Sequence, residues 1–433
     1  MKKYELDSYN GLIYEVNKKP NIAKYNLYFI RNARANFAKS MYDYGIRRID
    51  TFQINASAYA CAASCEYCAN ESCCKTRIEA ENDFITVKQL KEKLNEIKSK
   101  TQFADNLEVS FSGGDFILHP YYEKLIDVIF EEIDGNISFG WCMSGFHTLE
   151  DIDKFLNICD SLEQNERVIR NSIYLTVDMD GSNFRQSPIY HMTNDDTFDI
   201  AHIIAKHVNN RKTQLCISSK ISALCDINLM KINFDAFLNT YDDVIIRIGL
   251  IDGYYDITPS VKQVADTFDM LNKNYLTFYQ SRGASTLLVV NKDNEAIKKQ
   301  FGGYSMYLYE LEDGIYANHP FDLYCWCYIR FLGIDNKGYF PCFFGFDHTD
   351  DLDDIIKPNL LTNAGLNSEY IRWTDGECKQ CEFNALCKMC KRISCKNRPF
   401  RKEYMRQLIN VMTKDPTTWL IVNNPFNTGY LNE

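Results

Sequence analysis

Short apolar runs alternate with amphipathic periods along the central part of the chain. Thr51–Asn55 is the first β-like run, and the apolar positions between 87 and 97 then recur at helical spacing behind a capping box of Thr86 and Gln89. Five more strand-and-helix units follow, with predicted strands at Leu107–Ser112, Ile137–Cys142, Ile173–Asp178, Gln214–Ser219 and Val244–Gly249. Six such units predict a parallel sheet, because each crossover helix packs back onto it. The periodicity leaves open whether this sheet curls into a partial barrel or is flat and doubly wound.

The pattern changes after residue 255. Leu276–Gln280 and Thr286–Asn291 predict a strand pair, short cysteine-bearing turns then replace the helices, and a last amphipathic helix follows Pro399. We therefore expect five segments: an N-terminal extension at 1–50, an α/β domain at 51–255, a bridging region at 256–320, a cysteine-rich domain at 321–398, and a C-terminal helix and tail at 399–433.

The composition is that of a globular protein, with 433 residues, 45% of them hydrophobic and 24% charged, and a net charge of −10. It excludes a disordered chain, and the lack of a long unbroken apolar run excludes a membrane-spanning one. The acidic balance argues against an extended nucleic-acid track. Met1-Lys2-Lys3 is not followed by an apolar core of signal-peptide length, so we expect a cytoplasmic protein. In that reducing compartment, 17 cysteines indicate metal or thiolate chemistry.

The cysteines form two groups, with four further members between them in apolar segments. Those four, which we assign to the core, are Cys142, Cys159, Cys216 and Cys225. The first group begins with Cys61, Cys65 and Cys68 in the loop after the first strand, on the face where parallel α/β folds build their active sites. Three thiolates can hold three corners of an iron–sulfur cubane and leave the fourth iron open. A fourth ligand from Cys73 or Cys74 would instead close a zinc site, and the spacing leaves both interpretations open.

The spacing C-x3-C-x2-C, with Tyr67 before the last cysteine, resembles the cluster-binding loop of the radical SAM superfamily. The resemblance implies a partial (β/α)6 TIM-like barrel in which Cys61, Cys65 and Cys68 hold a [4Fe–4S] cluster that binds S-adenosylmethionine. It further implies that the cluster, reduced by a donor such as flavodoxin or ferredoxin, cleaves this cofactor to a 5′-deoxyadenosyl radical. The resemblance implies that this radical then abstracts a hydrogen atom from the substrate.

Two further segments are similar to motifs of that family. Gly113-Gly114-Asp115 resembles a Gly-Gly-Glu motif whose backbone edge receives the methionine amino group of the cofactor. Its glycines allow close approach of the backbone, and Asp115 is one methylene shorter than the family's acid. Residues 176–181 resemble the fourth-strand motif that contacts the ribose, which makes Asp178 the candidate there. The alternative for Asp178 is a solvated acid at a strand end.

The fifth and sixth strands supply the remaining cofactor-binding candidates. Ser218 and Ser219 end the fifth strand, and Arg247 lies in an otherwise apolar sixth strand. A charged side chain there has to point toward something polar, either the barrel mouth or a buried ionic partner. We assign Ser218 and Arg247 to the cofactor site.

The second group, eight cysteines between 325 and 395, resembles the SPASM extension of peptide- and small-molecule-modifying radical SAM enzymes. That extension is a small α+β domain with two auxiliary [4Fe–4S] clusters, which brings the implied total to three clusters. The resemblance places one ligand set at Cys325, Cys327, Cys342 and Cys390, and the other at Cys378, Cys381, Cys387 and Cys395. Two zinc ribbons are the alternative. Eight basic residues between 388 and 406 would raise the potential of a nearby cluster, dock an anionic partner, or form a solvated helix face.

Similarity to enzymes that modify ribosomally made peptides implies an oxidative modification or crosslink of a peptide. Only fifty residues precede Thr51, so we expect a separate leader-peptide-binding protein or, alternatively, a small amino-acid-like substrate. Phe343 follows Cys342 where the sulfatase-maturing branch carries Asp, which disfavours that branch. Asp347 and His348 are candidates for an acid or base. The rival from another class is a non-catalytic iron–sulfur or zinc scaffold.

Overall fold

A ten-stranded sheet dominates the computed structural model, which describes residues 3–7, 12–18, 48–68, 73–251, 256–280, 286–291, 308–312, 315–318, 331–341 and 348–356. The strand order is β13-β14-β12-β11-β9-β8-β7-β3-β17-β18. Six neighbouring strands are mutually parallel, namely β3 (Arg48–Ile54), β7 (Gln102–Phe111), β8 (Asn136–Met143), β9 (Val168–Thr176), β11 (Thr213–Ile221) and β12 (Val244–Leu250). The six predicted strands are thereby confirmed.

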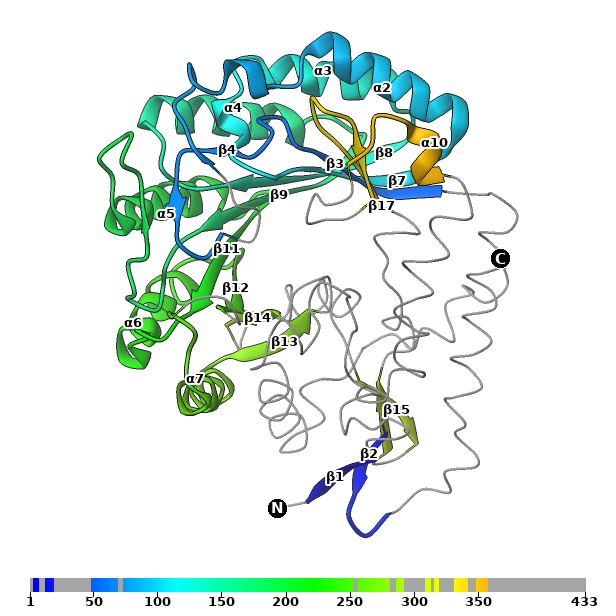
Figure 1. The fold of residues 1–433 in the computed structure, drawn as a ribbon. Coiled ribbons are helices and arrows are strands. Elements are labelled where there is room, and N and C mark those ends of the chain that lie inside the picture. The colour runs from blue at the N-terminus through cyan, green and yellow to red at the C-terminus, as the bar shows by residue number, and fades with distance from the viewer. Residues whose placement is uncertain are drawn as a thin grey trace.

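The order of these six strands settles how the sheet is wound. Each strand lies beside the one that precedes it in the chain, and the order never reverses as it does in a doubly wound sheet. The crossover helices are α2 (Val87–Lys100), α3 (Tyr122–Glu132), α4 (Leu149–Glu163), α5 (Asn194–Val208), α6 (Ile227–Leu238) and α7 (Val261–Asn274). They lie on the outer side of a curved sheet (Figure 1). This is the architecture of a partial (β/α)6 barrel.

Local sequence signals set the helix ends. At the start of α2, Thr86 Oγ1 accepts from the Gln89 amide at 3.1 Å, and the Gln89 side chain accepts from the Thr86 amide at 2.8 Å. This capping box satisfies two amides that the helix itself leaves without partners. The apolar positions Leu90, Leu94 and Ile97 are fully buried against the sheet.

The large sheet continues past residue 255 at one edge and into the C-terminal third of the chain at the other. The predicted strand pair is confirmed: β13 (Leu276–Gln280) and β14 (Thr286–Val290) pair antiparallel, and β14 adds to β12. At the opposite edge, β17 (Phe331–Ile334) pairs parallel with β3 and turns into β18 (Tyr339–Phe340), which is followed by the short α10 (Leu352–Ile356). The sheet therefore crosses the boundaries predicted at 255 and 320.

A second, four-stranded sheet joins the N-terminal residues to a segment near residue 315. It orders β1 (Tyr4–Asp7) and β2 (Leu12–Glu15) beside β16 (Ile315–Asn318) and β15 (Leu308–Glu312). Residues of the predicted N-terminal extension thus pair with residues of the predicted bridging region. The division into domains itself stays a prediction.

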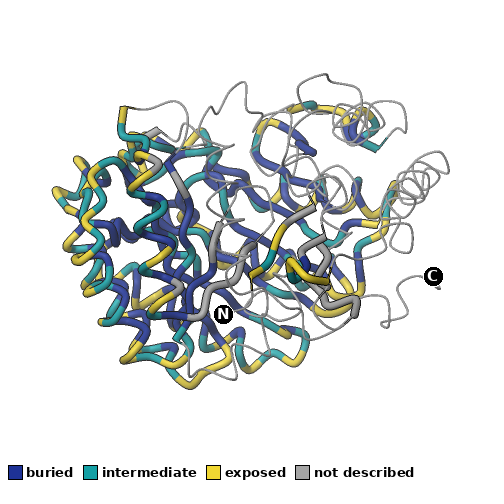
Figure 2. Tube along the Cα trace, turned by 90° about the horizontal axis from the view of Figure 1, so that it is seen from below, coloured by how far each residue is buried: buried dark blue, intermediate teal, exposed yellow. Residues whose placement is uncertain are grey.

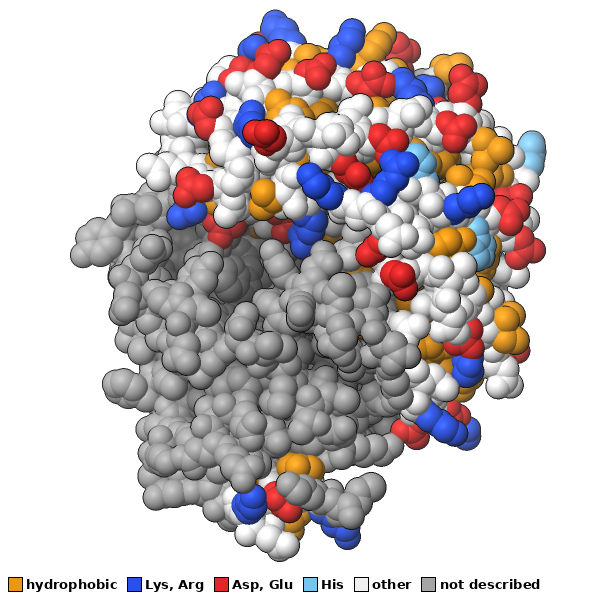
Figure 3. Space-filling view, turned by 180° about the vertical axis from the view of Figure 1, so that it is seen from behind, with side chains coloured by type: hydrophobic (Ala, Val, Ile, Leu, Met, Phe, Trp, Pro, Cys, Tyr) orange, Lys and Arg blue, Asp and Glu red, His pale blue; other side chains and the backbone are white. Residues whose placement is uncertain are grey.

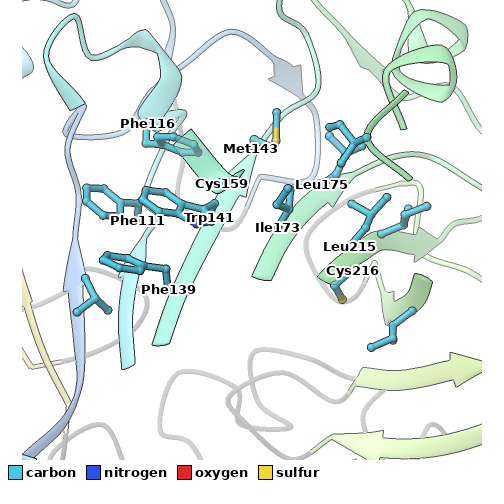
Figure 4. Close-up of a cluster of buried hydrophobic side chains, with 14 of the residues drawn as sticks. Phe111, Phe116, Phe139, Trp141, Met143, Cys159, Ile173, Leu175, Leu215 and Cys216 are labelled. Atoms are coloured by element: carbon cyan, nitrogen blue, oxygen red, sulfur yellow. The ribbon is translucent and has the colours of Figure 1, made fainter. Parts of the chain in front are cut away.

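The side of the sheet that faces the helices carries an aromatic core. The centre of the Trp141 ring lies 4.7 Å from that of Phe111 and 5.2 Å from that of Phe139, with both pairs stacked (Figure 4). The Trp141 ring also packs edge-on against Phe155. Its indole nitrogen donates to Asn171 Oδ1 at 2.5 Å. The strands are accordingly buried, while the outer turns of the helices are exposed (Figure 2).

The outer surfaces of the helices are polar. Lys91 and Lys98 of α2 form ion pairs with Glu131 and Glu132 of α3. Over the described part of the face shown in Figure 3, acidic and basic side chains are interspersed. Among the described residues, no helix has both the length and the apolar character needed to cross a bilayer.

Candidate active site

The loop after β3 brings the first three cysteines to the carboxyl edge of the sheet. Cys61 ends β4 (Ala60–Cys61), and Cys65 ends β5 (Ser64–Cys65). The loop then returns along β6 (Cys73–Cys74), which pairs parallel with β4, so that Cys61 lies opposite Cys74. The Lys75 amide donates to the Cys61 carbonyl at 3.1 Å. This short pairing fixes the backbone that carries the thiols.

Small side chains seat this loop on the rest of the protein. A separate buried group, which we call the alanine cluster, joins loop residues to neighbouring segments and consists of Ala60, Ala62, Ala63, Ala80, Phe84, Leu118 and Phe146. Cys61 and Cys65 pack against its edge. Alanines at three loop positions let the backbone approach closely, and Ser187 Oγ donates to the Ala62 carbonyl at 2.6 Å.

The three half-buried thiols lie close enough to influence one another. Burial raises the pKa of Cys61 well above its usual value, and the nearby Asp115, Cys65 and Cys68 raise it further. Burial also raises the pKa of Cys65, although the Arg185 charge opposes this. Thiolates in such a place need a positive centre, which bound metal supplies. Soft, half-buried and unbridged by disulfides, this donor set fits an iron–sulfur cluster.

A closed zinc site makes a different geometric demand. Among the described side chains, no three Cys, His, Asp or Glu residues converge on one point as the ligands of a single ion would. In a cubane each thiolate binds a different iron, so a cluster does not require this convergence. The Cys74 thiol donates to the Ala62 carbonyl at 3.6 Å, and the Cys73 side chain lies outside the described residues.

Gly113 and Gly114 follow β7 after one residue, Ser112, and lie against the start of the cysteine loop. Their φ angles are +82° and +126°, values that side chains disfavour. A Cβ atom on Gly113 would lie 2.2 Å from Asn55 Oδ1, and one on Gly114 would lie 2.4 Å from the Ala60 carbonyl oxygen. Both positions therefore require glycine, because the backbone here packs on the segment that leads to Cys61.

The Asp115 side chain is held by the loop after β8. Its carboxylate accepts from the Ser144 hydroxyl and lies 2.9 Å from His147 Nε2, with both Asp115 and His147 buried. Burial alone would raise the pKa of Asp115, but His147 and Ser144 stabilise the charged form and hold this pKa below its usual value. The Asp115 amide donates to the Ala60 carbonyl at 2.8 Å. Asp115 therefore anchors the glycine turn to the cysteine loop.

Two predicted cofactor-binding residues contact each other. Tyr67 Oη donates to Asp178 Oδ1 at 2.5 Å, and the Arg185 amide donates to Asp178 Oδ2 at 3.1 Å. Asp178 is 1% exposed, so the alternative of a solvated strand-end acid is wrong. Burial raises the pKa of Asp178, with Arg185 opposing it. The proposed ribose contact of Asp178 stays a prediction.

Arg185 is a site residue that the sequence did not reveal. It lies on β10 (Arg185–Gln186), which pairs antiparallel with β5 and places Arg185 opposite Cys65. The side chain is 1% exposed, and its guanidinium lies 5.0 Å from the centre of the Phe146 ring. The local sequence around Arg185 gives no sign of a functional role. Its partner Cys65 is 120 residues away, and only the pairing of β10 with β5 brings the two together.

Ser218 and Arg247 lie side by side on the inner face of the barrel. They are partners across β11 and β12, which β9, β8 and β7 separate from β3. Burial raises the pKa of Cys142 to about 11, and the Arg247 charge opposes this shift, so Arg247 points toward the inner face. Ser219 faces the other way and accepts from the Met179 amide at 2.9 Å. The cofactor contacts of Ser218 and Arg247 stay predictions.

The remaining candidates fall mainly outside the described residues. His348 Nδ1 lies 3.4 Å from Asp335 Oδ2, and Tyr59 Oη lies 3.5 Å from His348 Nε2, but Asp347 is not described. The eight C-terminal cysteines also lie outside the described ranges, namely Cys325, Cys327, Cys342, Cys378, Cys381, Cys387, Cys390 and Cys395.

Comparison with known proteins gives a likeness of fold. No protein-family model matches the chain, and no curated protein sequence does. The chain is similar to the solved structure of native anSMEcpe with bound AdoMet, with a TM-score of 0.54 and 16% identity over 85% of this chain and 97% of that one. It also aligns with coproporphyrinogen III oxidase (HemN) from Escherichia coli, a radical SAM enzyme, with a TM-score of 0.41 and 13% identity over 70% and 68%. The first likeness establishes a shared fold, whereas the second score is too low to establish one.

Proposed function

We propose that this chain is a radical SAM enzyme in which Cys61, Cys65 and Cys68 hold a [4Fe–4S] cluster with one iron open to S-adenosylmethionine. The observation that carries the proposal is the place of three mutually interacting thiols, in one loop at the carboxyl edge of a singly wound partial barrel. The shared fold with a structure that binds AdoMet supports it. When bound and reduced, the cluster supplies the electron that cleaves the cofactor and starts radical chemistry.

The residues around the loop orient the reactants. Gly113 and Gly114 present a backbone edge beside the loop, where no side chain can intervene. Tyr67 lies between the proposed ligands Cys65 and Cys68 in the sequence. Asp178 accepts a hydrogen bond from its hydroxyl group and so fixes the ring. The contacts of the Asp115 carboxylate with Ser144 and His147 hold the glycine turn in place. Together these contacts hold the loop and the residues around it in fixed positions.

The proposal extends to substrate and electron flow. A peptide is the substrate, and net two-electron oxidation or crosslinking is the outcome, with flavodoxin or ferredoxin as donor in the cytoplasm. The support is the similarity of the C-terminal cysteine pattern to an extension that carries two auxiliary clusters, which would accept the electron from the substrate radical. A small amino-acid-like substrate is the alternative.

Anaerobic reconstitution tests the core of the proposal. We expect about four irons and four sulfides per cluster, about twelve of each for three clusters, and 5′-deoxyadenosine once a reductant and S-adenosylmethionine are added. Stoichiometric zinc with no cleavage of the cofactor would contradict it. Incubation with a short peptide encoded beside the gene tests the substrate: a product lighter by two hydrogen atoms is expected, and turnover of a free amino acid instead would favour the alternative.

A further inference from the structure

We infer that Arg185 is a positioning residue for the proposed cluster: its buried guanidinium holds a permanent positive charge against the Cys65 sulfur and raises the reduction potential of the cluster bound there. The inference rests on the proposed function, because it concerns the cluster held by the cysteine loop. It adds a residue that no sequence motif marks.

Three contacts fix the guanidinium in place. It donates to the carbonyls of Thr176 and Ser144, at the ends of two neighbouring strands, and it packs over the Phe146 ring. Strand pairing places Arg185 opposite Cys65, and the nearby Cys65 thiol helps to raise the pKa of Arg185. A cation held by two carbonyls and a ring cannot swing away from the loop.

The charge of Arg185 is incompletely balanced by its protein neighbours. Those neighbours are the thiol of Cys65, the phenol of Tyr67 and the carboxyl group of Asp178. A thiol and a phenol are neutral groups, which leaves Asp178 as the acidic one, and Asp178 also accepts from Tyr67. Among the described residues, Arg185 Nε has no hydrogen-bond partner. A buried cation gains from further negative charge, and a thiolate-ligated cluster would add it at Cys65.

The consequence for a cluster follows from electrostatics. Reduction adds an electron, and a fixed positive charge next to a ligand sulfur lowers the energy of that electron. The effect is stronger in a buried site, where solvent screens little. An arginine keeps its charge at every physiological pH, so the contribution to the potential does not titrate.

The chain offers a matched control in Arg167. Its guanidinium also donates to backbone carbonyls, to Gly135 at 2.9 Å and Phe130 at 3.0 Å, and lies over the Phe130 ring at 5.5 Å. Arg167 directly precedes β9, at the opposite end of that strand from Asp178. Removing it takes away a similar set of bonds without touching the cysteine loop.

The test is a redox titration of reconstituted full-length protein, following the part of the electron paramagnetic resonance signal that changes when S-adenosylmethionine is added. We expect Arg185→Met to shift the midpoint potential of that signal to more negative values, Arg185→Lys to stay nearer the wild type, and Arg167→Met to leave the potential unchanged. Thermal unfolding of the cluster-free proteins serves as a second readout, in which both Met variants are expected to be less stable.

The outcomes separate the inference from the function on which it rests. An Arg185→Met protein with an intact cluster and a wild-type potential would overturn the inference. So would loss of the cluster in both Arg185→Met and Arg185→Lys, because shape rather than charge would then matter. Loss in Arg185→Met alone, with the cluster kept in Arg185→Lys, supports the inference. A wild-type protein that takes up no cluster would instead contradict the proposed function.

Discussion

The helix-facing side of the sheet and its carboxyl edge both bury side chains from solvent, but the buried side chains are of different kinds. Trp141 and Phe155 are 0% exposed in the first region, whereas Asp115 and Arg185 are 0% and 1% exposed in the second. Aromatic packing stabilises the first region through the removal of apolar surface from water. In the second region each buried charge needs a polar partner. The favourable energy of such a pair offsets the cost of desolvation but adds little to the stability of the fold.

The difference indicates that the two regions serve different ends. A sheet built only for stability would bury aromatic side chains at its edge as it does beneath its helices. Instead, the edge holds Asp115 and Asp178 in fixed hydrogen bonds beside three thiols. We therefore expect substitutions in the two regions to separate chemistry from stability.

The largest expected effect comes from a pair of identical substitutions, one in each region. Cys65→Ala removes a proposed cluster ligand, and we expect formation of 5′-deoxyadenosine to fall to the level without protein. Cys159→Ala lies in the aromatic core on α4, where Cys159 is 1% exposed. It is expected to cost about 1 kcal/mol of unfolding free energy and to leave cleavage of the cofactor intact. Cleavage that survives in Cys65→Ala would show that the site is assigned to the wrong loop.

The next effect is confined to the aromatic core. Phe155→Ala opens a cavity against Trp141 and Phe116. We expect the free energy of unfolding to fall by about 3–5 kcal/mol in urea denaturation. Phe155→Leu keeps most of the volume and is expected to lose clearly less. Equal losses in the two variants would mean that the ring does not pack as described.

A charge at the carboxyl edge is expected to have a smaller, pH-dependent effect on stability. The pKa of Asp115 is lowered in the folded protein, so its carboxylate stabilises the fold above the unfolded pKa and loses this contribution as the pH falls through the folded value. Asp115→Asn is expected to cost about 1–3 kcal/mol at pH 7. The difference in unfolding free energy between the wild type and Asp115→Asn is expected to narrow below about pH 4.

Urea denaturation at pH 7 and at acidic pH measures this effect, with the exposed Asp127→Asn as control. Asp127→Asn is expected to leave the unfolding free energy unchanged at both pH values. A gap between wild type and Asp115→Asn that stays constant on acidification would contradict a lowered pKa.

The smallest expected effect lies at the start of α2, away from both buried regions. Thr86→Ala removes the side chain that accepts from the Gln89 amide and is expected to cost about 1 kcal/mol of unfolding free energy. Thr86→Ser keeps the acceptor and is expected to restore most of it. Loss of cofactor cleavage in either variant would contradict the separation of the two regions.

Sequence reasoning predicted those features whose cause is local. The six strands, the capping box at Thr86 and the loop with Cys61 follow from periodicity and spacing. The contact between Tyr67 and Asp178 joins residues 111 positions apart, and no pattern in either segment predicts it. The pairing of β17 with β3 joins residues even further apart in sequence, Phe331 and Thr51, which is why the predicted boundaries follow local changes of pattern rather than the sheet.

The central claim is that the loop with Cys61, Cys65 and Cys68 holds a cluster with one iron open to S-adenosylmethionine. Electron paramagnetic resonance of the anaerobically reconstituted, reduced protein, recorded before and after addition of S-adenosylmethionine, tests this most directly. The account predicts that the cofactor changes the signal of one cluster in the wild type and of none in Cys65→Ala. A signal that the cofactor leaves unchanged in the wild type, with no 5′-deoxyadenosine formed, would contradict it.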